Sequence, residues 1–86
     1  MNKDKKQIRE VLKHLENKRF SSTHFLISYL KGHFKQSEIK ANFVKHSDLV
    51  DEEDYRIDIS IDNYVGSIWY LKTRQREFFI TKAMLD

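Results

Sequence analysis

The chain has 86 residues, with 16 Lys or Arg, 13 Asp or Glu, and a formal net charge of +3. This length fits a single domain spanning residues 1–86. The chain has no Cys, which excludes disulfides, thiolate metal sites and Cys nucleophiles. No apolar run approaches the ~20 residues that span a bilayer, and the charged N-terminus is not followed by the apolar part of a signal peptide. We therefore expect a cytoplasmic protein with no membrane partner.

The charge is unevenly distributed along the chain. Residues 1–47 carry eleven Lys or Arg and four Asp or Glu, hence +7. Residues 48–62 carry one Arg and seven Asp or Glu, hence −6, and residues 63–86 carry four and two, hence +2. The basic first half would attract a nucleic acid. The acidic stretch would repel one, whereas a protein partner could use both signs of charge.

The first expected element is an amphipathic helix over residues 4–18. Ile8, Val11, Leu12 and Leu15 follow the i, i+3, i+4, i+7 spacing of one helical face. This stripe predicts that the helix packs on the core of the domain.

The next segment, residues 21–31, fits two structures. Ser21 or Ser22 can cap a helix, and Gly32 suits the position after its C-cap. Alternate residues of the segment would also suit a strand. We favour the helix and leave the strand open. The apolar side chains at helical spacing are Phe25, Leu26, Tyr29 and Leu30.

Residues 37–46 are a third helix candidate. Ser37 would be the cap, and Ile39, Phe43 and Val44 would form the apolar side.

The period then changes to two. Residues 55–62 alternate between apolar and polar side chains, which predicts a strand with one solvated face. Residues 63–66 suit a turn, and residues 67–73 and 77–85 read as two further strands. The expected fold is α+β: two to three N-terminal helices packed on a C-terminal three-stranded antiparallel meander.

The last two strands carry apolar side chains on both faces. We expect Ile68 and Tyr70 on one face and Trp69 and Leu71 on the other. Either the strand ends curl into the core or the surplus is covered by a loop, a helix, a second copy or a partner. On the last strand, Phe78, Ile80 and Met84 are expected to oppose Phe79, Ala83 and Leu85. The candidate partner or homodimer interface is Trp69, Leu71 and Phe79.

The sequence favours a binding protein over an enzyme. Its four His residues show no ligand spacing, and there is no nucleophile motif, phosphate loop or dinucleotide fingerprint. The acidic run 51–54 lacks the ligand pattern of a calcium loop. We therefore expect no catalytic residue, no metal and no cofactor.

If residues 21–31 and 37–46 are both helices, residues 32–36 join them as in a helix-turn-helix unit. The hairpin that follows would then be a wing. This order of elements resembles a winged helix, although no motif carries the resemblance. Side chains of the types that contact phosphates and base edges lie on the third helix and on the turn after the second strand. The candidate nucleic-acid-binding residues are Gln36, Lys40, Asn42, Lys45, Lys72, Arg74 and Arg76.

Three binding functions stay open. The first is a nucleic-acid-binding regulator of winged-helix character. The second is a protein-interaction module or small inhibitor that uses the aromatic sheet face and the charged surfaces. The third is a binder of single-stranded nucleic acid, because bases stack on aromatic side chains. The aromatics considered for that role are Trp69, Tyr70, Phe78 and Phe79.

Overall fold

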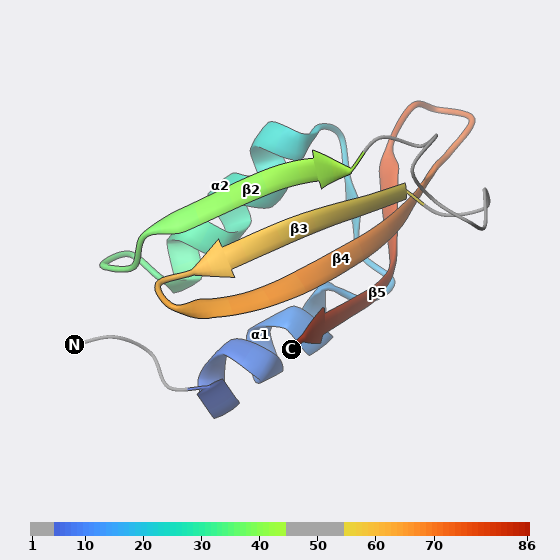
Figure 1. Ribbon diagram of the computed structural model, residues 1–86. Helices are drawn as coiled ribbons and strands as arrows, with labels where there is room; N and C mark the ends of the chain where they lie inside the picture. Colours follow the sequence, from blue (N-terminus) through green and yellow to red (C-terminus); the bar gives the residue numbers. More distant parts are fainter. Residues whose placement is uncertain (1–4, 45–54) are drawn as a thin grey trace.

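The computed structural model describes residues 5–44 and 55–86. The described residues form two helices and five strands, and the helices lie on one side of the sheet (Figure 1). Lys45 and the part of the acidic stretch formed by residues 48–54 lie outside the described residues. In chain order the elements are α1 (Lys5–Leu15), β1 (Arg19–Phe20), α2 (Thr23–His33), β2 (Ile39–Val44), β3 (Tyr55–Ile61), β4 (Tyr64–Lys72) and β5 (Phe78–Leu85).

The five strands form one antiparallel sheet in the order β1-β5-β4-β3-β2. Figure 1 shows β4 and β3 between β5 and β2. The prediction of a three-stranded meander is therefore wrong: the three expected strands exist, but β1 and β2 extend the sheet on either side. Residues 5–44 and 55–86 form an α+β fold with two helices and five strands.

The third predicted helix is the largest error, because residues 39–44 form the edge strand β2. Ile39 pairs with Ile61 and Phe43 pairs with Ile57, so the side chains alternate between the two faces of the sheet. Ala41 and Phe43 remain exposed, although they pair with the buried Ile59 and Ile57 on the helix side of the sheet. Half-exposed positions give a weak period-two signal, and the same residues also fit a helical stripe.

The helix expected over residues 21–31 is confirmed. Ser22 is the N-cap of α2, and its hydroxyl accepts a hydrogen bond from the N–H of Phe25. The helix continues past the predicted end, because Gly32 lies in its last turn and Phe34 is the C-cap. Since α2 is followed by a strand, there is no helix-turn-helix unit in the described residues. The expected winged-helix arrangement is wrong.

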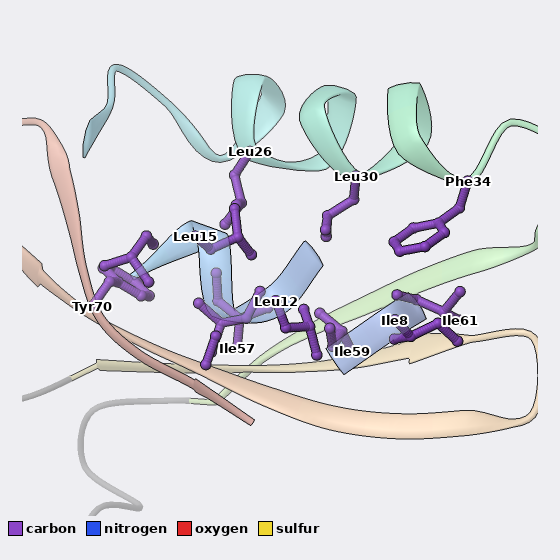
Figure 2. Close-up of a cluster of buried hydrophobic side chains, with 13 residues drawn as sticks. Ile8, Leu12, Leu15, Leu26, Leu30, Phe34, Ile57, Ile59, Ile61 and Tyr70 are labelled. Atoms are coloured by element: carbon purple, nitrogen blue, oxygen red, sulfur yellow. The ribbon is translucent and has the colours of Figure 1, made fainter. Parts of the chain in front are cut away.

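Both helices pack on the same face of the sheet. Their apolar stripes meet side chains of β3, β4 and β5, and Figure 2 shows these side chains pointing toward one another between the helices and the strands. The stripe predicted for α1 is confirmed, with Ile8, Leu12 and Leu15 buried and Val11 half-buried. The buried residues are Ile8, Leu12, Leu15, Leu26, Leu30, Phe34, Ile57, Ile59, Ile61, Ile68, Tyr70, Ile80 and Ala83.

A β-bulge in β5 decides which side chains reach this core. Trp69 pairs with Lys82, but the next residue, Tyr70, pairs with Ile80, so Thr81 is an extra residue on β5. The Thr81 hydroxyl donates to the carbonyl oxygen of Trp69 at 3.3 Å. Without the bulge, the period of two would place Lys82 on the same face as the buried Ile80.

Because of the bulge, the faces predicted for the residues of the last strand are wrong after Thr81. Ala83 is buried and Met84 is exposed, although Met84 was expected to share a face with Ile80. The predicted opposition holds before the bulge, where Phe79 faces away from the core, and reverses after it. The surplus of apolar residues in β5 is thus partly core, because Ala83 and Leu85 join Phe78 and Ile80 on the helix side.

Residues 16–18, which follow α1, form hydrogen bonds with the part of β5 that lies beyond β1. The N–H of Asn17 donates to the carbonyl of Ile80 at 2.8 Å, and the N–H of Ile80 donates to the carbonyl of Lys18 at 2.9 Å. Further along, the carboxylate of Glu16 accepts a hydrogen bond from the N–H of Ala83 at 3.2 Å. These bonds satisfy backbone groups of β5 that β1, with two residues, does not reach.

Candidate functional site on the open sheet face

The second face of the sheet, here called the open face, is covered by neither described helix. The register places its side chains in cross-strand rows, because directly paired residues of antiparallel strands point to the same side. The open-face rows are Arg19, Phe79 and Leu71; Lys82, Trp69, Arg56 and Val44; Met84, Ser67, Asp58 and Asn42; and Val65, Ser60 and Lys40.

Five neighbouring side chains of this face form what we call the aromatic patch: Arg19, Trp69, Leu71, Phe79 and Lys82. A basic side chain lies over each of the two aromatic rings, Trp69 and Phe79. Lys82 Nζ lies 5.2 Å from the centre of the Trp69 ring, and the Arg19 guanidinium lies 5.7 Å from the centre of the Phe79 ring. The patch contains two basic groups and no carboxylate, so it is a positively charged surface with two aromatic rings.

Arg56 lies beside the aromatic patch on the open face, and its charge is paired with Asp58. It pairs directly with Trp69, so this ring has Lys82 on one side and Arg56 on the other. The Arg56 Nε lies 3.1 Å from Asp58 Oδ1, which also accepts a hydrogen bond from Ser67 at 3.1 Å. Asp58 belongs to the acidic stretch of residues 48–62, which would repel a nucleic acid. The ion pair with Arg56 offsets the charge of Asp58.

The edge strand β2 carries two predicted nucleic-acid-binding residues, Lys40 and Asn42, and both are exposed on the open face. They line a shallow depression of about 200 Å³ with Asp58, Ser60 and other residues of β2, β3 and β4. Lys40 Nζ lies 3.4 Å from the carboxylate of Glu38, and this highly exposed pair contributes little stability. Three strand spacings, roughly 14 Å, separate β2 from β5. The two residues therefore lie at the opposite edge from the aromatic patch.

The remaining predicted residues lie outside the open face or at its border. Arg74 and Arg76 are exposed in the turn between β4 and β5, next to the Leu71–Phe79 pair. Lys72, at the end of β4, points to the helix side, with Nζ 5.1 Å from the centre of the Tyr55 ring. Gln36 is exposed in the turn before β2, and Lys45 lies outside the described residues.

The four aromatics considered for base stacking divide between the two faces. Tyr70 and Phe78 belong to the core side and contact each other edge to face, with ring centres 4.9 Å apart. Trp69 and Phe79 lie on the open face. Together with Leu71 on the same face, they are the three residues predicted as a partner interface. Only this second pair is available to a ligand of the open face.

Sequence reasoning missed Arg19, Arg56 and Lys82 as site residues. Arg19 reaches the face because β1 pairs with the remote β5, and Lys82 reaches it because of the bulge. Neither event has a local signal in the sequence. Arg56 could have been found, because the alternation of residues 55–62 already placed it on the solvated side of its strand.

Tyr70 is buried on the core side of β4, where its ring stacks on that of Tyr55. The pKa of its hydroxyl is raised above the usual 10.0, first by burial and second by the neighbouring Tyr55. In the unfolded chain this hydroxyl ionises at a lower pH than in the folded protein. The stability that the un-ionised Tyr70 hydroxyl contributes to the folded state is therefore fully present below about pH 10. It is lost as the pH rises through the pKa of the folded protein.

We expect this linkage to disappear in Tyr70→Phe. Below pH 9 the free energies of unfolding of the two proteins should differ by a constant amount. Above pH 10 the wild type should lose stability relative to the variant, because only its unfolded state gains an ionised hydroxyl at this position. Urea unfolding at pH 8, 9, 10 and 11 measures the difference. A difference that stays constant up to pH 11 would contradict the raised pKa.

We also examined metal sites, membrane-spanning helices and similarity to known proteins. Among residues 5–44 and 55–86 there is no group of three or more His, Cys, Asp or Glu side chains able to hold a metal ion. In the same ranges no helix has the length and apolar character needed to cross a bilayer. Comparison of the chain with protein-family models, with curated proteins and with solved structures finds no match.

Proposed function

We propose that this is a non-enzymatic, cytoplasmic protein that binds nucleic acid on the open face of its sheet. The observation that carries the proposal is the aromatic patch, where two rings and two basic groups lie together without a carboxylate. A polyanion with flat apolar bases complements both features, since phosphates attract the cations and bases contact the rings.

The cations of the patch are available to a ligand. Among the described residues neither Arg19 nor Lys82 forms an ion pair, and both side chains are exposed. Arg74 and Arg76 in the adjacent turn continue the positive charge beyond the end of the sheet. A strand of nucleic acid that crosses the patch toward this turn would meet four basic groups.

The salt dependence of binding tests this proposal. We expect the affinity for a fluorescein-labelled 12-nucleotide oligomer to fall steeply between 50 and 200 mM NaCl, because bound phosphates release counterions. Lys82→Gln and Arg19→Gln should each reduce the slope of log K against log salt by roughly 0.7–0.9, the loss of one phosphate contact. Fluorescence anisotropy gives the affinity at each salt concentration.

Lys13→Gln is the matched control. Lys13 is exposed in the last turn of α1, and its replacement changes the net charge of the protein by the same amount. The control should leave the salt slope unchanged if the open face is the binding surface. An equal reduction in all three variants would place the ligand elsewhere or show attraction to the overall charge alone.

A protein-interaction module is the second candidate, favoured by the exposed apolar side chains Val65, Leu71 and Met84 on the same face. If the protein fails to bind the oligomer at 50 mM NaCl, the nucleic-acid proposal is overturned. A concentration-dependent dimer in sedimentation equilibrium would then favour a second copy of the chain as the partner.

A further inference from the structure

The backbone positions that carry the two rings of the aromatic patch are farther apart than two stacked bases. Trp69 and Leu71 lie two residues apart on β4, and Leu71 pairs with Phe79 on β5. The backbone positions of Trp69 and Phe79 are therefore one strand spacing and two residue rises apart, roughly 8 Å. Successive nucleotides of a stacked duplex strand advance by only ~3.4 Å. Two neighbouring bases can reach both rings only if they are unstacked.

The width of the sheet also disfavours a duplex. Five strands extend across four spacings, which is roughly 19 Å. The major groove of B-form DNA is ~12 Å wide and admits a helix or a two-stranded ribbon. This sheet face cannot enter the groove, so a duplex would touch the cations only through its backbone and would leave the rings without a contact.

The cations already lie over the rings on which bases would stack. In the free protein Lys82 lies over the Trp69 ring and Arg19 lies over the Phe79 ring. A phosphate competes for each cation, because a charge-assisted bond to phosphate is stronger than an exposed cation–π contact. Binding would thus shift each cation from its ring to the backbone of the ligand and leave the ring to a base.

We propose that the open face takes single-stranded nucleic acid, with two neighbouring bases stacked on Trp69 and Phe79 and the adjoining phosphates bound by Lys82 and Arg19. This inference rests on the proposed function and narrows its ligand to a single strand.

The single Trp of the chain gives a direct readout. With oligo(dT) of 12 nucleotides at 50 mM NaCl, we expect quenching of the Trp69 fluorescence and tighter binding than with a 12-base-pair dA–dT duplex. Trp69→Leu should weaken oligo(dT) binding by roughly 5- to 150-fold, the range for loss of one stacked base. Its salt slope should stay unchanged, because no phosphate contact is removed. Phe79→Leu should behave in the same way.

Two further variants separate stacking from general damage. Trp69→Phe keeps a ring and should recover most of the affinity lost in Trp69→Leu. Phe25→Leu removes an exposed ring from α2, outside the open face, and should leave binding unchanged. Quenching is measured on the wild type, so the inference can be tested even if Trp69→Leu does not fold.

The outcomes distinguish this inference from the proposed function. If duplex and single strand bind equally, without quenching but with the slope change in Lys82→Gln, the proposed function stands and base stacking is overturned. If neither oligomer binds at 50 mM NaCl, both are overturned. Quenching by oligo(dT) with loss of affinity in Trp69→Leu and Phe79→Leu supports both.

Discussion

Replacing Phe34 by Ala is expected to lower the free energy of unfolding by about 3–5 kcal/mol. Phe34 is the C-cap of α2 and is only 2% exposed. Its ring points from the end of the helix toward the sheet (Figure 2). Truncation would remove the ring from the core and leave a cavity between α2 and the strands. A domain of this length has a total stability of only about 4–13 kcal/mol, so the loss is a large share of it.

Phe25→Ala is the matched control, because Phe25 lies on the same helix but is 56% exposed. Its replacement should change the free energy of unfolding by no more than about 0.5 kcal/mol. Urea unfolding followed by circular dichroism measures both variants against the wild type. Similar losses for the two substitutions would show that α2 does not face the sheet as described.

Deletion of Ser67 is expected to unfold the domain, whereas deletion of Thr81 is expected to be tolerated. Ser67 lies in the regular part of β4, so its removal would turn the following residues over and send Ile68 and Tyr70 to the open face. Loss of these two buried side chains costs roughly 1.5–3 kcal/mol each. Trp69 would enter the core in their place.

Thr81 is different because it is the extra residue of the bulge. Without it, Ile80 is followed by Lys82 in a regular strand, and Lys82 still points to the open face. The expected cost is mainly the hydrogen bond from Thr81 to Trp69, about 0.5–1.5 kcal/mol. Thermal unfolding of both deletions tests this difference. Two equally unstable variants would mean that the bulge does more than set the faces of β5.

The elements with strong periodicity could be predicted from the sequence. The stripe that includes Ile8, Leu12 and Leu15 predicts α1, and the alternation around Ile57 and Ile59 predicts β3, because each buries one complete face. The edge elements could not be predicted in this way. β1 has two residues and exists through its pairing with β5, and β2 leaves most of its side chains exposed.

The candidate site was only partly predictable. Trp69, Leu71 and Phe79 could be recognised as surplus apolar residues because the sequence shows more of them than one sheet face can bury. Of their two basic neighbours, Arg19 comes from a strand that is remote in the sequence, and Lys82 reaches the open face only because of the bulge. The charge distribution also pointed to the helical half, whereas the aromatic patch takes only Arg19 from it.

The position of β5 inside the sheet has a consequence for how the protein folds during synthesis. β5 is the last strand along the chain, yet it lies between β1 and β4 and is the main packing surface of α1. The first helix therefore has no stable place until some seventy later residues have left the ribosome. Contacts between residues far apart in the sequence, such as those of α1 with β5, slow folding. In the nascent chain the apolar stripe of α1 therefore stays exposed until β5 has been synthesised.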